Sequence, residues 1–192
     1  MKKKVEHIAL TIKGDLVEAQ TRADPVRALA ELVWNSLDAD ASNVQVELEK
    51  NNLGTLSKIV IYDDGGGFSR AEAAALFGSL GGSWKRLSRV TKTKQRAMHG
   101  QEGRGRYKAF ALGSIAEWKV CYLKDGKPFS YSILLQENDL TDVCISEESA
   151  AKGQKPGVII KIENLKKDFQ SLTSEAGMQE FCEIFAIYTP TP

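Results

Sequence analysis

The segment ELVWNSLDADA, residues 31–41, carries a glutamate, an asparagine and an aspartate at helical spacing, namely Glu31, Asn35 and Asp38. On a helix these three side chains fall within about 60° of one another. An asparagine oxygen one turn from a carboxylate suits a hard cation such as Mg²⁺, which takes few protein ligands and keeps waters. A carboxylate one turn away is placed to orient a water molecule. The simplest alternative is a solvent-facing stripe, and this segment alone leaves both interpretations open.

A glycine turn, YDDGGGFS at residues 62–69, follows an apolar strand. Asp63 ends that strand, where its carboxylate is placed to point into a pocket. An ionised carboxylate only accepts hydrogen bonds, so it suits an exocyclic amino group such as that of adenine. Gly65 and Gly67 permit positive φ and the close approach of a ligand. A tight turn without a ligand remains the alternative, and the neighbouring Asp64 has no role that the sequence assigns.

A second glycine cluster lies in HGQEGRGRYKAF, residues 99–110, directly before a predicted helix. Converging amide groups at a helix N-terminus form a phosphate cradle. The cluster is no Walker A loop, because no GK[ST] follows, and Lys108 stands at the third glycine position of a GxGxxG pattern. Positive charge near such phosphates comes from Arg104, Arg106 and Lys108. For the cluster alone, a flexible loop is the alternative.

The elements that position these clusters follow from hydrophobic periodicity. A helix is predicted over residues 24–39, with Asp24 as its N-cap, Pro25 in its first turn and an apolar stripe through Val26, Leu29, Val33 and Leu37. Further helices are predicted over 69–79, 107–113 and 174–188, and strands over 5–14, 43–50, 56–65, 116–124, 127–135 and 157–165. Because short turns join several strand pairs, the pattern predicts a two-layer α/β sandwich with a mixed, largely antiparallel sheet.

Length, charge and cysteine content narrow the class of protein. The 192 residues, with a formal net charge of +1, predict one globular domain and give no argument for broad nucleic-acid or membrane attraction. Three widely spaced cysteines without metal-ligand spacing indicate a reducing compartment, so a cytoplasmic location is expected. No apolar run reaches the length of a membrane span. The basic run at residues 85–96 favours a solvated loop that attracts a triphosphate, and leaves a nucleic-acid partner open.

Together and in this order, the three clusters resemble the GHKL superfamily of ATPases, which includes gyrase B subunits, the large heat-shock chaperones, histidine kinases and MutL. The resemblance covers residues 24 to 165 or so. The motif E-x3-N-x2-D-A stands here as Glu31, Asn35, Asp38 and Ala39, and D-x-G-x-G as Asp63, Gly65 and Gly67. The third motif, in the version closest to the chaperones, stands as Gly100, Gly103 and Gly105.

The resemblance implies the Bergerat fold, an α+β two-layer sandwich with helices on one face of the sheet and the nucleotide between helices and sheet. It implies Glu31 as general base, Asn35 as Mg²⁺ ligand and Asp63 as adenine contact. Residues 78–106 would form an ATP lid, with Ser83 and Lys85 as phosphate contacts. The other nucleotide-binding positions that it implies are Asp38, Gly65, Gly67, Gly100, Gln101, Glu102, Gly103, Arg104, Gly105 and Val158.

One position departs from the family pattern. The fourth motif usually ends in Gly-Thr, whose threonine supports the contact between aspartate and adenine, whereas this chain has Gly157 and Val158. A valine side chain cannot donate that hydrogen bond. Either a water or another side chain completes the network, or adenine binds more weakly.

The expected function is Mg²⁺-dependent ATP binding with slow hydrolysis, driving a conformational or dimerisation cycle in a larger protein of which residues 1–192 are the N-terminal ATP-binding domain. Hydrolysis by this chain alone is expected to be slow, because many relatives take a further cation from a following domain. A nucleotide-dependent homodimer is the expected assembly. Two alternatives stay open: a non-hydrolysing nucleotide-sensing module, and a histidine kinase catalytic domain, which the Asp38-Ala39 pair disfavours.

Overall fold

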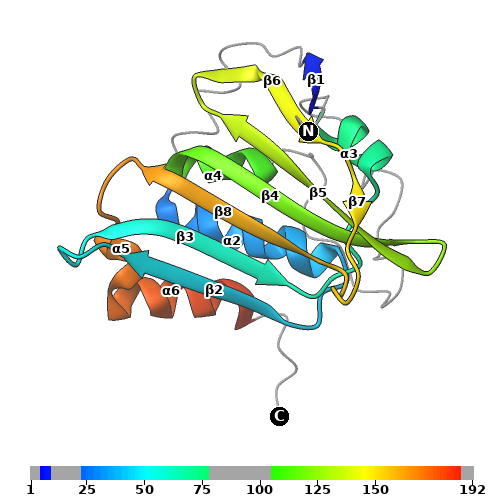
Figure 1. The fold of residues 1–192 in the computed structure, drawn as a ribbon. Coiled ribbons are helices and arrows are strands. Elements are labelled where there is room, and N and C mark those ends of the chain that lie inside the picture. Colours follow the sequence, from blue (N-terminus) through cyan, green and yellow to red (C-terminus); the bar gives the residue numbers. More distant parts are fainter. Residues whose placement is uncertain (1–4, 10–22, 78–104, 187–192) are drawn as a thin grey trace.

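One antiparallel sheet forms the framework of the protein (Figure 1). The structure, a computed structural model, describes residues 5–9, 23–77 and 105–186. The strands run in the order β1-β6-β5-β4-β8-β3-β2, and the short β7 pairs with β5. Their bounds are β1 Val5–Ala9, β2 Val44–Lys50, β3 Leu56–Asp63, β4 Gly113–Lys124, β5 Lys127–Gln136, β6 Asp139–Ser146, β7 Ser149–Ala150 and β8 Gly157–Leu165. Every strand pair in the described ranges is antiparallel.

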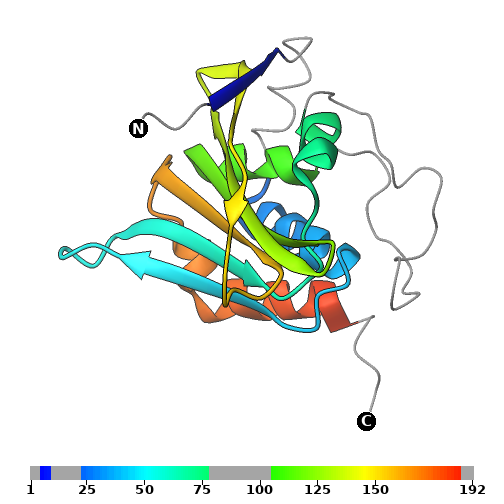
Figure 2. The same cartoon turned by 45° about the vertical axis from the view of Figure 1, so that its right-hand side comes forward.

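The helices cover one face of this sheet, as Figures 1 and 2 show from two directions. They are α2 Pro25–Asp38, α3 Arg70–Phe77, the 3₁₀ helix η2 Gly105–Lys108, α4 Ala109–Leu112, α5 Gln170–Thr173 and α6 Glu175–Ala186. The hydrophobic core fills the space between these helices and the sheet. The predicted two-layer α+β sandwich is therefore confirmed, and the described part of its sheet is wholly antiparallel.

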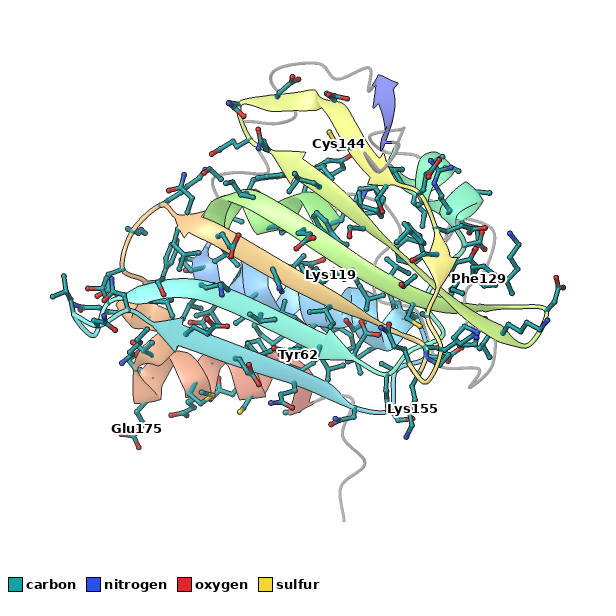
Figure 3. All side chains as sticks on the ribbon, in the orientation of Figure 1. Tyr62, Lys119, Phe129, Cys144, Lys155 and Glu175 are labelled. Carbon is teal, nitrogen blue, oxygen red and sulfur yellow. The ribbon has the colours of Figure 1, made fainter. Side chains whose placement is uncertain are left out.

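The opposite face of the sheet carries paired charges and, among the described elements, no helix. Tyr62 and Lys119 lie on it in one row across three strands (Figure 3). Lys58 Nζ contacts Glu49 Oε2 at 2.9 Å, and the Tyr62 hydroxyl donates to Glu47 Oε2 at 3.2 Å. Because neighbouring strands present opposite charges, this face is stable in water without a second layer.

Local signals explain where the site-bearing elements begin. The Asp24 carboxylate accepts the N–H groups of Val26 and Arg27 at 2.9 and 3.2 Å, and Pro25 is the first residue of α2, as predicted. Helix α3 begins with a capping box in which the Ser69 N–H donates to Glu72 Oε2 at 2.7 Å and the Glu72 N–H donates to Ser69 Oγ at 3.2 Å. Both helices therefore start at fixed positions, and the start of α3 directly follows the glycine turn.

Several elements differ from the sequence-based expectation. The helix predicted over 107–113 forms as η2 followed by the four-residue α4, and the sequence analysis did not find β6, β7 or α5. In β6 the buried Val143 and Ile145 alternate with polar residues, but the aspartates at its start hide this pattern. Described β1 ends at Ala9, and residues 10–14 of the predicted first strand lie outside the described ranges.

Helix α6 packs on α2 through aromatic side chains. The ring of Trp34 lies 4.8 Å from that of Phe185, which lies 5.1 Å from that of Phe181. The Trp118 side chain is buried in the core against Phe77 at 5.1 Å. In these contacts the aromatic side chains serve packing. Among the described helices, none is long and apolar enough to cross a membrane.

Candidate functional site

Three elements meet at the carboxylate of Asp63, the last residue of β3. The Ser36 hydroxyl, on α2, donates to Asp63 Oδ2 at 2.7 Å. The main-chain N–H groups of Gly65 and of Val158, on β8, donate to Asp63 Oδ1 at 3.0 and 3.1 Å. The first and second sequence clusters and the β8 strand are therefore joined at one side chain.

The hydrogen bonds around Asp63 leave it able to accept one more. Within the described residues two donors bind Oδ1 and one binds Oδ2, and each carboxylate oxygen has two lone-pair directions, so one direction on Oδ2 is left for a further donor. Burial raises the pKa of Asp63, and the hydrogen bonds from Ser36, Gly65 and Val158 act against that rise. The negative charge of Asp64 raises the same pKa slightly further. A ligand N–H donor that bound here would meet a carboxyl oxygen held in place by three protein donors.

The family pattern has a threonine beside the aspartate, and in this chain two of the three donors to Asp63 come from other groups. Val158 donates through its main-chain N–H, and its side chain donates no hydrogen bond. The hydroxyl comes from Ser36, which is 3% exposed. The sequence analysis missed Ser36. The signal that would have found it is a hydroxyl among apolar residues of a buried helix, because such a group needs a partner.

The third glycine cluster meets the first at Gly105, the first residue of η2. A Cβ atom built on Gly105 would lie 2.9 Å from Asn35 Nδ2 and 3.4 Å from Glu31 Oε2. Glu31 and Asn35 are both half-buried. The main chain of η2 therefore lies directly against the ends of both side chains, and a Cβ at position 105 would have to displace the Asn35 amide. The remaining predicted positions of this region, Ser83, Lys85, Gly100, Gln101, Glu102, Gly103 and Arg104, and residues 78–104 of the predicted lid, lie outside the described residues.

The helix face that carries the polar stripe is partly covered by other elements. Asp38 is only 4% exposed, so the alternative of a solvent-facing stripe is excluded for this residue. The reason is that α2 is covered on several sides: η2, α4, α5 and α6 all contact it, besides the sheet. Of the polar side chains of α2, Ser36 and Asp38 are therefore buried, whereas Glu31 and Asn35 are half-buried.

Asp64, which the sequence analysis left without a role, holds the loop after α2. Its Oδ1 accepts the main-chain N–H groups of Ser42 and Asn43 at 2.6 and 2.8 Å. These bonds tie residues 42–43 to the glycine turn and keep the C-terminal end of α2 next to Asp63. The contacts assign Asp64 a structural role.

The glycines of the turn are required by close approach of the main chain. A Cβ on Gly65 would lie 2.8 Å from the Ala39 carbonyl oxygen, and one on Gly67 would lie 2.2 Å from that of Cys121. Gly67 also has φ +62°, a conformation that costs other residues energy. The turn is therefore wedged between the end of α2 and β4, which fixes the direction of Asp63 at its start.

Gly67→Ala is expected to lower the free energy of unfolding by about 2 kcal/mol or more, because the new Cβ meets a β4 carbonyl and the residue stays at positive φ. Gly66→Ala is the matched control, since a Cβ on the exposed Gly66 meets nothing within 4 Å. That control should change stability by about 1 kcal/mol or less. Urea unfolding followed by circular dichroism measures both. Equal losses of stability for the two variants would contradict the close packing of Gly67 against the Cys121 carbonyl of β4.

A cavity of about 1210 Å³ lies on the other side of the glycine turn. It is lined by residues 66–72, 122–125, 147 and 148. Several polar groups of this lining are paired: Lys124 contacts Glu148 Oε1 at 2.6 Å, the Tyr122 hydroxyl donates to the same carboxylate, and Arg70 Nε donates to the Ser146 carbonyl at 2.9 Å. The lining includes Gly67 but none of Glu31, Asn35 and Asp63, so this cavity adjoins the candidate site and does not contain it.

Comparison with known proteins agrees with the motifs. A family model described as "Histidine kinase-, DNA gyrase B-, and HSP90-like ATPase" matches residues 23–167. A DNA mismatch repair protein MutL of Akkermansia muciniphila is 25% identical over 177 residues, which are 88% of this chain and 26% of the relative. A DNA mismatch repair protein MutL of Clostridium beijerinckii is 28% identical over 180 residues, which are 86% of this chain and 23% of the relative. The chain thus spans about a quarter of the length of these curated relatives.

Proposed function

This chain belongs to the family of histidine kinase-, DNA gyrase B- and HSP90-like ATPases, the GHKL superfamily, and from that premise we propose that it binds ATP together with Mg²⁺ and hydrolyses it slowly. The observation that carries the proposal is the convergence of α2, β3, β8 and η2 on two adjoining groups. One is the Asp63 carboxylate with its three donors, and the other is Glu31 and Asn35 beneath Gly105.

Asp63 would recognise the base. Its available lone pair on Oδ2 suits the exocyclic amino group of adenine, which needs an acceptor. Guanine presents a carbonyl oxygen at the corresponding ring position, and that oxygen would face an ionised carboxylate. The three protein donors act against the rise in the pKa of Asp63 that burial causes, and so favour the ionised form that accepts hydrogen bonds.

Asn35 and Glu31 would act at the phosphates. Among the described residues, no group of three or more histidine, cysteine, aspartate or glutamate side chains is placed to hold a metal ion. Mg²⁺ needs no such group, because it binds through one or two protein oxygens and takes its other ligands from phosphates and water. When bound, the ion would neutralise charge on the phosphates. Asn35 Oδ1 would hold it, and Glu31 would accept a proton from the attacking water.

The nucleotide cycle would belong to a larger protein. The relatives with the quoted similarity are named DNA mismatch repair proteins, and this chain covers about a quarter of their length. We propose that ATP binding drives a conformational or dimerisation cycle in such a protein. The helix-free face of the sheet carries neighbouring charges of both signs, as in the pairs Lys58–Glu49 and Lys119–Glu117, and so does not favour a phosphate backbone as its partner.

The proposal predicts binding of a non-hydrolysable ATP analogue with Mg²⁺ that weakens on acidification. Protonation of Asp63 removes its acceptor role, and because burial raises the pKa of Asp63, the loss starts above the pH range of an ordinary aspartate. In Ser36→Ala a hydrogen bond that lowers this pKa is gone, so the loss should start at a still higher pH. Isothermal titration calorimetry across pH 4–8 measures both curves.

Ser57→Ala is the control, because the exposed Ser57 donates to the Glu49 carbonyl near the start of β3 and lies in none of the site contacts. Titration of the ATP phosphates affects all three proteins equally and cancels in the comparison. Absence of analogue binding by the parent at every pH would refute the proposed function. Superimposable curves for the parent and Ser36→Ala would refute the role of Ser36.

In the ligand-free protein the raised pKa of Asp63 lowers folding stability as the pH rises, whereas the same rise in pH favours ligand binding. A carboxyl group whose pKa is higher in the folded than in the unfolded state binds its proton more tightly when folded. Its contribution to stability is therefore fully present below the unfolded pKa and is lost as the pH rises through the folded pKa. Asp63 thus supports ligand binding when ionised and costs folding stability in the same state.

A further inference from the structure

Three side chains join the end of α3 to the start of η2, and we call them the clasp: Phe77, Arg106 and Tyr107. The Tyr107 hydroxyl donates to the Phe77 carbonyl oxygen at 3.2 Å. The Arg106 guanidinium lies over the rings of Phe77 and Tyr107, 5.3 and 4.8 Å from their centroids. Cation–π contacts of this kind strengthen when they are removed from water. The clasp thus connects two residues, 77 and 107, that are far apart along the chain.

The clasp is anchored in the hydrophobic core. Phe77 is 3% exposed and Tyr107 is 2% exposed. The Phe77 ring meets Trp118 of β4 edge-to-face at 5.1 Å and stacks on Phe68 at 6.5 Å. Interiors packed this closely transmit displacement and do not absorb it. The position of η2 is therefore tied to the sheet through Phe77.

The same two residues of η2 directly follow the residue that touches the candidate site. Gly105 precedes Arg106, and its main chain lies so close to Asn35 and Glu31 that a Cβ would be 2.9 Å from Asn35 Nδ2 and 3.4 Å from Glu31 Oε2. A small shift of Gly105 must therefore move Asn35 or Glu31, or open a gap beside them. The described contacts that hold the start of η2 from the α3 side are those of Arg106 and Tyr107.

We propose that Arg106 and Tyr107 are positioning residues, which hold the main chain of Gly105 against Asn35 and Glu31 and so align the metal ligand with the base. Their side chains contact Phe77 in the aromatic core, so they can act on Gly105 without contacting the nucleotide. The inference rests on the proposed function for its catalytic consequence, although the geometry that it describes exists without a ligand. Misplacement of reacting groups by about 1 Å lowers rates by up to about 100-fold.

The chain offers a matched control at the other end of α3. The Tyr131 hydroxyl donates to the carbonyl oxygens of Phe68 and Ser69 at 3.0 and 3.3 Å, and Tyr131 is 4% exposed. Tyr107 and Tyr131 are thus both buried, and both donate to main-chain carbonyls that flank the same helix. The variants Tyr107→Phe and Tyr131→Phe each remove one buried hydroxyl and keep the ring, so their general cost in stability should be similar.

The experiment measures turnover, ATP-analogue affinity in EDTA and urea unfolding for the parent and both variants. For Tyr107→Phe we expect a fall in kcat of about 10- to 100-fold, with affinity in EDTA within about twofold of the parent, because base recognition by Asp63 does not depend on the clasp. For Tyr131→Phe we expect kcat within about twofold of the parent at a comparable loss of stability.

A spectroscopic measurement makes the inference independent of activity. In the ligand-free protein the ¹⁵N resonance of the Asn35 side-chain amide should shift in Tyr107→Phe and stay in place in Tyr131→Phe. An unmoved Asn35 resonance, or a kcat that falls equally in both variants, overturns the inference. Failure of the parent to bind any nucleotide overturns the proposed function and leaves the resonance to decide the role of the clasp.

Discussion

Asp63→Asn is expected to abolish ATP binding, with an affinity at least about 100-fold below that of the parent. The two main-chain donors, Gly65 and Val158, require an oxygen at the Oδ1 position, so the new amide must point its NH₂ group to the position of Oδ2. That NH₂ group then faces the Ser36 hydroxyl and the incoming amino group, both of which are donors. Losing a charged acceptor while burying unpaired donors costs several kcal/mol.

The matched control for this prediction is the neighbouring Asp64→Asn. Asp64 uses one oxygen to accept the N–H groups of Ser42 and Asn43, and an amide oxygen can do the same. Its affinity for the ATP analogue should stay within about threefold of the parent. Calorimetry in the presence of Mg²⁺, after circular dichroism has verified the fold of both variants, gives the comparison. Parent-like binding by Asp63→Asn would mean that the base is recognised elsewhere.

Features that depend on local sequence were predictable. The start of α2 follows from Asp24 and Pro25, because capping and proline geometry act over a few residues. The β2–β3 hairpin follows from residues 51–54, where Gly54 has φ +80°. The sandwich itself follows from strand pairs with short connections. In each case the residues that determine the feature lie within one turn or one strand pair.

Features that depend on distant contacts were not predictable. Ser36 meets Asp63 across 27 positions of sequence, and nothing local to either residue indicates the pairing. The burial of Asp38 depends on the helices that cover α2, which a helical projection of one segment cannot include. The need for glycine at position 67 depends on the Cys121 carbonyl of β4, which is distant in sequence. The motifs thus indicate which residues matter, and the packing decides what each of them contacts.

The network around Asp63 also explains how the site can do without the usual threonine. A main-chain N–H is present at position 158 whatever side chain stands there, and Ser36 donates the hydroxyl from a helix that is already held by the core. The donors that the family pattern takes from a strand threonine therefore come here from the main-chain N–H of Val158 and the hydroxyl of Ser36. The sequence position that departs from the family pattern need not weaken the acceptor.

Glu31→Ala is expected to retain ATP binding within about threefold while turnover falls by about 10²- to 10⁴-fold, the usual contribution of a general base. None of the bonds described around Asp63 involves Glu31, so base recognition should stay intact. Its carboxylate lies beside Gly105 at the position where the glycine cluster would place phosphates. Phosphate release under saturating ATP and Mg²⁺, together with calorimetric affinity, separates the loss of chemistry from a loss of binding.

Two further variants determine what a negative result would mean. Glu31→Gln keeps the size and hydrogen-bonding reach of the side chain but cannot take up a proton at neutral pH, so it should be as inactive as Glu31→Ala. Glu47→Ala removes a carboxylate from the helix-free face and should hydrolyse ATP like the parent.

If Glu31→Ala and the parent release phosphate at the same measurable rate, the base is another group. If the parent binds the analogue tightly and releases no phosphate, the non-hydrolysing module is the correct interpretation, because recognition by Asp63 would then exist without the chemistry assigned to Glu31.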